Sequence, residues 1–252
     1  MPITHTITDG IAEVVMDNPP VNALNVAGWF ELADVVRSLG DDPKVRVLVL
    51  RAEGRGFNAG VDIKEMQATD GYAALIGANR GCYAAFAAVY DCAVPVIAAV
   101  NGFCLGGGIG LVGNADIIVA ASDATFGLPE VDRGALGAAT HLARLVPQHK
   151  MRAMVYTSAT ATAAELHHFG SVLEVVEPSE LREAAWRIAR QISEKSPTVI
   201  RAAKESLNGI DPVDVKRSYR FEQGFTFELN LSGVSDEARD AFVAKRDAEF
   251  DQ

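Results

Sequence analysis

The chain has 252 residues, of which 49% are hydrophobic and 22% are charged, and its formal net charge is −10. This composition is that of an ordinary soluble globular protein with one large core or two modest ones. The acidic balance argues against nucleic acid or an anionic membrane surface as the main partner, since no basic footprint is present. A small polyanionic ligand is not excluded, because it needs only a few local cations.

The cysteines and the N-terminal segment bear on redox state and location. The three cysteines form no C-x-x-C pair, which argues against a disulfide framework or a zinc site. Residues 1–9 lack the basic start and the apolar stretch of a signal peptide, and no apolar run reaches the roughly 18 to 20 residues of a membrane span. We therefore expect a cytoplasmic protein without a metal and without membrane association. The cysteines are Cys82, Cys92 and Cys104.

In the first half of the chain, short apolar runs alternate with segments of helical spacing. Asp9-Gly10 splits the first two runs and predicts a hairpin. The loop at 18–25 carries two prolines, which exclude a helix or a central strand. The loop at 51–66 contains three glycines and re-enters regular structure around Asp62. The expected elements are strands 3–8 and 11–17, helix 26–39, strand 45–50, helix 72–90 and strand 95–100.

The second half begins with two more short extended segments and then becomes mostly helical. Repeated strand–helix units predict an α/β layer fold whose loops at strand C-termini carry the chemistry. A composition shift near Ser196-Pro197 divides a core, residues 1–196, from a helical region, residues 197–252. The expected elements are strand 115–121, an extended piece 125–130, helices 138–146, 149–158 and 161–168, strand 172–176, and helices 179–194, 198–207, 212–228 and 235–250.

Residues 95–113 are the most informative stretch. A run typical of a buried strand leads through Asn101-Gly102 to three consecutive glycines, 106–108. Glycines cost backbone entropy, so their likeliest use is contact with the backbone itself, where free N–H groups at a helix start attract an anion or a developing oxyanion. Two alternatives stay open: close helix–strand packing, and a dinucleotide fingerprint, since 108–113 reads G-x-G-x-x-G. For the fingerprint, Gly108 lies too far beyond the strand.

Two glycine-bearing loops, 51–66 and 101–108, each close a buried strand. N–H groups from both loops converging on one carbonyl oxygen would make an oxyanion hole. Three blocks, 57–66, 101–108 and 126–130, resemble the signature blocks of the crotonase (enoyl-CoA hydratase/isomerase) superfamily, in that family's order and spacing. Residues 240–246 resemble its closing segment. The resemblance covers nearly the whole chain and rests on specific motifs.

The resemblance implies an α/β fold, a spiral of repeated β-β-α turns followed by a C-terminal helical trimerisation region. It implies that residues 1–196 form the spiral core, which binds coenzyme A and the acyl group and carries catalysis. Residues 197–252 would mediate oligomerisation and complete the coenzyme A site. The expected partners are an acyl-CoA substrate and further copies of the chain, as a homotrimer or a dimer of trimers. No prosthetic group is implied, since the substrate is carried as a coenzyme A thioester.

The resemblance also assigns residues. It implies that the N–H groups of Val61 and Gly107 are the oxyanion donors and that Glu130 is the general base. Without the motif, the two lysines in the implied coenzyme A path would be interpreted as solvated charges. The residues implied for the coenzyme A path are Ala23, Leu24, Ala59, Val61, Asp62, Ile63, Lys64, Leu105, Gly106, Phe242 and Lys245.

One departure from the family bears on the reaction. Hydratases of the family carry a glutamate on the helix after the triple glycine and another in the Pro-Glu block, whereas this sequence has Gly110 and Glu130. Hydration of a C=C bond usually needs two carboxylates, one for water and one for the second proton. A single base facing a thioester enolate can instead move a proton, or can activate water against a carbonyl.

Residues 130–147 and 221–232 resemble the actinobacterial crotonase-type hydrolases that open one of the last rings in steroid (cholesterol) catabolism, acting on an indane-dione carboxyl-CoA. The implied reaction is a retro-Claisen ring opening of a bicyclic, β-diketone-like thioester. Water activated by Glu130 attacks a ring ketone, the C–C bond breaks, and the thioester oxygen at the Val61 and Gly107 N–H groups receives the electron density.

Other interpretations stay open. The chain could be an enoyl-CoA isomerase or hydratase of fatty-acid-type β-oxidation, or a CoA-binding scaffold without catalysis, although the retained Glu130 argues against a scaffold. Asp132, Arg133 and His141 could assist catalysis, or could be a surface ion pair and a helix-face histidine. The cysteines are expected in the core or in a pocket lining. The histidines expected in solvent are His5, His149, His167 and His168.

Overall fold

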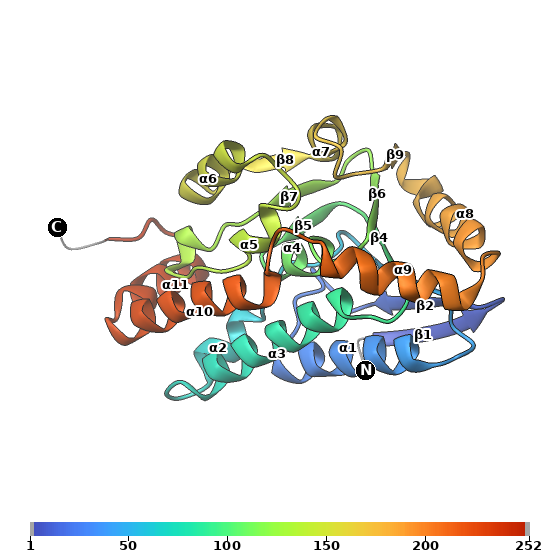
Figure 1. Cartoon of the computed structure of the whole chain (residues 1–252). Helices are drawn as coiled ribbons and strands as arrows, with labels where there is room; N and C mark the ends of the chain where they lie inside the picture. The colour runs from blue at the N-terminus through green and yellow to red at the C-terminus, as the bar shows by residue number, and fades with distance from the viewer. Residues whose placement is uncertain (1–2, 250–252) are drawn as a thin grey trace.

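The computed structural model describes residues 3–249, and its main feature is a six-stranded sheet of order β1-β2-β3-β4-β6-β9. The first two strands form the predicted antiparallel hairpin, and the other neighbours are parallel. Figure 1 shows the sheet between two sets of helices. The strands are β1 (Ile3–Thr8), β2 (Ile11–Met16), β3 (Val47–Ala52), β4 (Val96–Val100), β6 (Ile117–Ala121) and β9 (Glu174–Val176).

A second sheet of three short strands, β5 (Phe103–Leu105), β7 (Thr125–Gly127) and β8 (Thr160–Thr162), has the order β5-β7-β8. Strand β4 is followed by β5, and β6 is followed by β7, so that successive turns of the chain add one strand to each sheet. This repetition agrees with the predicted β-β-α spiral. Strands β5 and β8 were not predicted, because three residues between glycines or at a helix start carry no strand periodicity.

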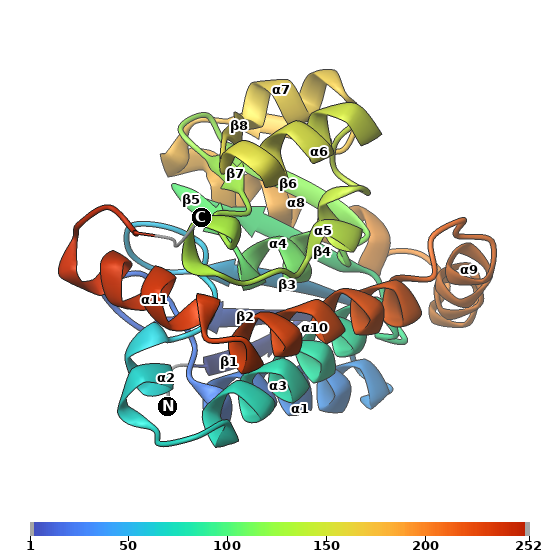
Figure 2. The same cartoon turned by 90° about the vertical axis from the view of Figure 1, so that its left-hand side faces the viewer.

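Helices cover both sheets. Helices α1 and α3 pack against each other, and α8 packs against β2, β3, β4 and β6. In Figure 2, α10 and α11 run in succession across the molecule, with α10 beside α3, and α9 stands at one side. The helices are α1 (Val26–Asp41), α2 (Ile63–Ala68), α3 (Ala73–Tyr90), α4 (Gly107–Val112), α5 (Ala139–Leu142), α6 (Gln148–Thr157), α7 (Ala163–His168), α8 (Leu181–Ser193), α9 (Pro197–Gly209), α10 (Val215–Leu231) and α11 (Val234–Ala244), with 3-10 turns η1 (Val131–Arg133) and η2 (Pro178–Glu180).

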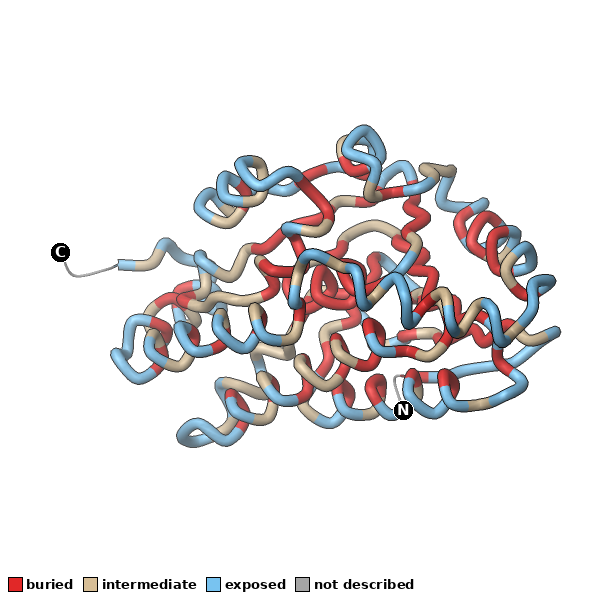
Figure 3. The backbone as a smooth tube through the Cα atoms, viewed as in Figure 1, coloured by how far each residue is buried: buried red, intermediate tan, exposed pale blue. Residues whose placement is uncertain are grey.

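The core lies between the sheet and these helices, as the buried backbone at the centre of Figure 3 shows. All five residues of β4 are buried, as expected of a parallel strand covered on both faces. The largest fully buried side chains include Trp29 in α1 and Phe86 in α3. Both of these side chains border the candidate active site, so the core and the site share a wall.

The predicted elements agree with the structure except at several boundaries. The helix predicted over 138–146 is only Ala139–Leu142, because Ala138 has left-handed backbone (φ 61°) and helical geometry is lost beyond Ala143. The last helix ends at Ala244 rather than 250, and residue 250 lies outside the described residues. Among residues 3–249, no helix combines the length and the apolarity that crossing a membrane requires.

Candidate active site

The two predicted oxyanion donors lie on backbone segments that touch. Leu24 pairs with the segment around Val61: its N–H donates to Gly60 O over 3.0 Å, and Asp62 N–H donates to Leu24 O over 3.0 Å. The Val61 N–H is therefore left out of the pairing. Gly107 opens α4, so its N–H has no acceptor within the helix. A Cβ on Gly60 would lie 3.1 Å from Gly107 N, which places the two segments in contact.

Glycine at 106 allows the carboxyl of Glu130 to reach this backbone. Gly106 has φ +57° and ψ −119°, a conformation that side chains disfavour. A Cβ there would lie 2.6 Å from Glu130 Oε1. The Gly106 N–H donates to Gly127 O over 3.1 Å, which ties the glycine loop to β7. The carboxyl thus lies one residue from the Gly107 N–H, as a base acting on a thioester at an oxyanion hole requires.

Glu130 is the titratable group best suited to proton transfer here. It occupies the N-cap position of η1 just beyond β7 without a capping hydrogen bond from its side chain, and its Oε2 atom is buried without a hydrogen-bond partner among the described residues. Burial raises the pKa of Glu130 to about 7; the Arg133 charge opposes this and the Glu222 charge adds to it. A carboxyl with a pKa near neutrality can both accept and return a proton at physiological pH.

The position of the missing second carboxylate is filled by an aromatic ring. A Cβ on Gly110 would come within 2.5 Å of Phe86 Cε1, and closer still to Cζ and Cε2. Phe86 is 2% exposed and contacts Trp29 edge-on, with ring centroids 5.7 Å apart. The indole ring in turn lies against Gly107, where a Cβ would be 2.7 Å from its Cη2 atom. An aromatic wall therefore stands where hydratases of the family carry a glutamate.

His141 and Tyr219 extend this wall. The His141 ring lies 5.1 Å from the rings of both Phe86 and Tyr219. His141 is 1% exposed, and neither of its ring nitrogens has a partner within the described residues. Burial, and next the Arg144 charge, lower its pKa to about 3. His141 thus lies on the enclosed face of α5, and its ring does not face solvent.

The other suggested assistants are placed differently. Asp132 is exposed. Arg133 donates to Pro129 O over 2.9 Å, and its guanidinium lies 4.1 Å from the centre of the Phe242 ring. Arg133 thus connects the turn after Glu130 to α11. The remaining histidines are exposed and the three cysteines are buried free thiols, as predicted: His5, His149, His167 and His168; Cys82, Cys92 and Cys104.

Most residues of the predicted coenzyme A path meet near the donors. Ala59 N–H donates to Val21 O over 3.1 Å, next to Ala23 and Leu24, and Leu105 N–H donates to Asn58 O over 2.9 Å, next to Gly106. The Asp62 side chain caps α2, which carries Ile63 and Lys64. The outer members of the path, Lys64, Phe242 and Lys245, are exposed, the last two at the end of α11.

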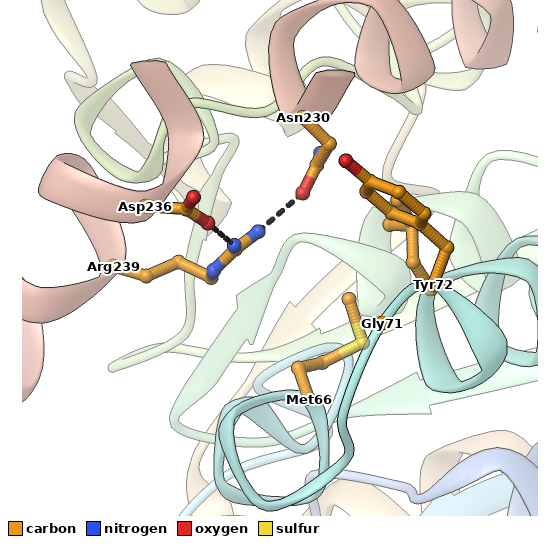
Figure 4. Close-up of a pocket in the computed structure, with 7 residues that line it drawn as sticks. Met66, Gly71, Tyr72, Asn230, Asp236 and Arg239 are labelled. Atoms are coloured by element: carbon orange, nitrogen blue, oxygen red, sulfur yellow. Dashed lines mark hydrogen bonds and ion pairs between the residues drawn. The ribbon is translucent and has the colours of Figure 1, made fainter. Parts of the chain in front are cut away.

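A cavity of about 200 Å³ opens between the α2–α3 segment and the α10–α11 segment (Figure 4). Arg239 projects into it between Asp236 and Asn230, opposite Met66 and Tyr72. It does not include the candidate catalytic residues. It separates α2 and α11, the two helices that carry the outer residues of the predicted coenzyme A path.

Glu222 is a feature of the site that sequence reasoning missed. Its carboxylate accepts hydrogen bonds from the N–H groups of Ala139 (2.8 Å) and Thr140 (2.7 Å) and from the Thr140 hydroxyl. It thereby fixes the start of α5, the helix that carries His141. Burial raises the pKa of Glu222. In the sequence Glu222 is one acidic residue of an amphipathic helix, and no local pattern distinguishes it.

Comparison with known sequences decides the family. A model of the enoyl-CoA hydratase/isomerase family matches residues 6–252. The chain belongs to this family. Among curated relatives it is 70% identical over 244 residues to the (7aS)-7a-methyl-1,5-dioxo-2,3,5,6,7,7a-hexahydro-1H-indene-carboxyl-CoA hydrolase of Rhodococcus jostii RHA1, covering 96% of this chain and 95% of the relative. It is 68% identical over 246 residues to the Mycobacterium tuberculosis H37Rv protein of the same name, covering 97% and 100%.

Solved structures of the enoyl-CoA hydratase/isomerase family share the fold. A carnitinyl-CoA hydratase from Mycobacterium avium has a TM-score of 0.87 at 28% identity, over 99% of this chain and 98% of that one. An enoyl-CoA hydratase from Mycobacterium avium subsp. paratuberculosis K-10 has a TM-score of 0.88 at 21% identity, over 100% and 99%, a likeness that concerns the fold alone. The predicted crotonase-type fold is thus confirmed.

Proposed function

We propose that this chain opens a ring of a bicyclic, ketone-bearing coenzyme A thioester by hydrolysis, in steroid catabolism. Identities of 70% and 68% to two relatives named as hydrolases of a dioxo-hexahydro-indene-carboxyl-CoA support this substrate class. The observation that carries the reaction type is the unpaired carboxyl of Glu130, buried beside the Gly107 backbone, together with the aromatic ring at Gly110. The other carboxylate of the site, Glu222, is occupied by hydrogen bonds from Ala139 and Thr140. One base without a second free carboxylate suits attack by water on a ketone better than hydration of a double bond.

In the proposed reaction Glu130 removes a proton from water as the water oxygen adds to the ring ketone. The ring bond between the attacked ketone carbon and the adjacent ring carbon then breaks. Its electron pair moves into conjugation with the thioester. The thioester oxygen accepts hydrogen bonds from the Val61 and Gly107 N–H groups, which stabilise the enolate. Protonated Glu130 returns its proton to carbon. Its pKa of about 7 fits both transfers.

The coenzyme A moiety is proposed to follow the line from Ala23 and Leu24 to α2 and α11, with its phosphates near Lys64 and Lys245. The cavity between these helices supports that path. No prosthetic group takes part in the proposed reaction. The three buried thiols support a reducing compartment, and we place the protein in the cytoplasm.

The proposed organisation divides the chain into a spiral core, 1–196, and a helical region, 197–252, through which copies associate as a trimer or a dimer of trimers. The helical region supports this by its exposed apolar side chains, which a monomer would leave in water. Sedimentation velocity tests it, and a monomer at micromolar concentration would contradict it. These side chains are Val199, Leu207 and Ile210 around α9, and Phe221, Phe225 and Leu231 on α10.

The test of the reaction is incubation of the purified protein with the bicyclic diketone thioester, followed by mass spectrometry. The expected product is heavier by one water, and Glu130→Gln abolishes its formation while coenzyme A affinity is retained. Unchanged substrate would overturn the proposal. Conversion of a 3-enoyl-CoA into a conjugated thioester would identify an isomerase instead, and tight coenzyme A binding without turnover of either substrate would identify a scaffold.

A further inference from the structure

One buried group of the site has no role in these steps. His141 is enclosed by Phe86 and Tyr219, and both of its ring nitrogens lack a partner in the described part of the chain. A neutral imidazole carries one N–H donor and one acceptor. Leaving such a group unbonded in a packed interior is unfavourable, because its hydrogen bonds to water are lost and not replaced. An orphaned donor beside an active site is a group that a bound ligand can complete.

The protonation state of His141 decides what it can donate. Burial and the nearby Arg144 charge lower its pKa to about 3, so the imidazole is neutral at every pH at which the protein would work. A neutral imidazole N–H can polarise a carbonyl without transferring its proton. It cannot act as a general acid near neutrality, because its conjugate acid is not populated.

Tyr219 connects His141 with Glu130: burial and, among smaller effects, the Glu130 charge raise the pKa of Tyr219, whose ring lies 5.1 Å from the His141 ring. Glu130 Oε1 lies against Gly106, the N-cap of α4, and the Phe86 ring lies against Gly110, about one helical turn further along. The His141 ring follows at 5.1 Å from Phe86. Helices α3, α4, α5 and α10 pack around this region (Figure 2).

The proposed ring opening creates negative charge on two oxygen atoms. The thioester oxygen becomes negatively charged when the C–C bond breaks, and it accepts hydrogen bonds from the Val61 and Gly107 N–H groups. The ring-ketone oxygen takes charge earlier, when water adds. We propose that the His141 N–H donates to the ring-ketone oxygen and stabilises this first alkoxide. This inference rests on the proposed function and makes His141 a further catalytic residue.

Glu130 takes one proton from water, the water oxygen bonds to the ketone carbon, and the C=O π pair moves to the oxygen held by His141. That pair re-forms the C=O bond as the ring C–C bond breaks, and the bond pair moves into the thioester enolate. Glu130 returns the proton to carbon. One water is consumed and one carboxylic acid is formed, and His141 keeps its proton throughout.

Infrared spectroscopy of the bound ketone tests the contact without turnover. The substrate, with ¹³C at the ring ketone, is bound to Glu130→Gln and to Glu130→Gln/His141→Leu. We expect a lowered C=O stretch in the first protein and loss of that shift in the second. A bound ketone with the same stretch in both overturns the role of His141 alone. Failure of the thioester to bind Glu130→Gln overturns the proposed function as well.

Kinetics of single variants test the contribution to rate. His141→Leu is expected to lower kcat about 10²- to 10³-fold, the usual loss for one oxyanion donor, with little change in KM. His141→Gln keeps an N–H donor and recovers part of the rate. The matched control is His149→Leu on the exposed face of α6, which leaves kcat unchanged. The proposal is contradicted if His141→Leu has the same kcat as wild type. It is also contradicted if His141→Leu and His141→Gln lose the same factor in kcat and both lose coenzyme A affinity.

Discussion

The Phe86 ring lies against the Cα atom of Gly110, so closely that a Cβ on residue 110 would come within 2.5 Å of Phe86 Cε1. Real Cβ atoms do not approach other atoms to that distance, so a side chain at 110 and the ring at 86 exclude each other. Two residues therefore exclude a second carboxylate here. Gly110 has no side chain, and Phe86 fills the space that a side chain at 110 would need.

Gly110→Ala is predicted to destabilise the protein by about 1–3 kcal/mol, because the added methyl overpacks the ring. In a helix without that contact the same change would stabilise by up to about 1 kcal/mol. Gly224→Ala on α10 is the matched control, since no atom lies within 4 Å of its added Cβ. Urea unfolding measures both. The cost of Gly110→Ala should shrink in a Phe86→Leu background, and an unchanged cost would contradict the steric explanation.

Gly110→Glu is predicted not to create a hydratase. The new carboxylate has no room beside Phe86, and burial near Glu130 would in addition raise its pKa. Hydration of crotonyl-CoA, followed by loss of the conjugated-thioester absorbance, should stay within a few-fold of wild type. Any gain is expected only in Gly110→Glu/Phe86→Ala, where space is made. A large gain from the single substitution would show that the ring moves aside.

The rate of the proposed reaction is predicted to depend on the ionisation of Glu130. Its pKa in the free protein is about 7, and only the carboxylate form can take a proton from water. Thus kcat/KM should fall about tenfold per pH unit below that pKa and level off above it. The neutral His141 adds no second inflection between pH 5 and 9. If kcat/KM instead falls around pH 4.5, the ordinary pKa of a glutamate, Glu130 is solvated in the working enzyme.

The sequence predicted the backbone segments of the site better than the side chains that enclose it. Glycines, prolines and apolar runs are local signals, and they sufficed for the hairpin at Asp9-Gly10, for α3 and for the loop that re-enters structure at Asp62. The donors Val61 and Gly107 followed from motifs, and the structure places their segments in contact.

The wall could not be predicted, because its members come from four helices and only packing brings them together. Phe86 is one apolar residue among many in α3, and Tyr219 lies over 100 residues away in the sequence. The burial of His141 likewise follows from α10 covering α5, where Glu222 holds the helix start. Periodicity reports that a face is buried and does not report what it faces.

Glu130 is also predicted to cost stability at neutral and alkaline pH. Its folded-state pKa of about 7 lies above the ordinary glutamate value of 4.5. Below pH 4.5 the Glu130 carboxyl is mostly protonated in both the folded and the unfolded state, so it costs little stability. As pH rises from 4.5 to 7, the unfolded state loses this proton first and the free energy of unfolding falls. Above pH 7 the full loss is reached. Glu130→Gln should therefore raise the free energy of unfolding by roughly 1–3 kcal/mol at pH 8 and by much less at pH 5. Urea titrations at both pH values measure this, and a pH-independent difference would contradict it.

Glu13 is predicted to be a stabilising carboxylate, in contrast to Glu130. It is 5% exposed in β2 and accepts hydrogen bonds from Arg182 Nε (2.8 Å) and Trp186 Nε1 (2.7 Å), and it pairs with Arg51. Because Arg51 is largely buried and keeps only the exposed Glu53 as a partner after Glu13→Gln, we expect a loss of about 2–3 kcal/mol in urea unfolding at pH 7. Glu53→Gln, which removes the exposed partner of the same arginine, should cost less than about 1 kcal/mol.

The pH dependence separates the charge of Glu13 from its packing. Burial alone would raise the pKa of Glu13, but the hydrogen bonds from Arg182 and Trp186 and the arginine charges outweigh it and lower the pKa. A carboxyl with a lowered folded-state pKa contributes stability above its unfolded pKa, near 4.5, and that stability is lost as pH falls through the folded value. The difference between wild type and Glu13→Gln should therefore shrink from pH 7 to pH 3.5. If it stays constant, the side chain stabilises the sheet through shape and neutral hydrogen bonds instead.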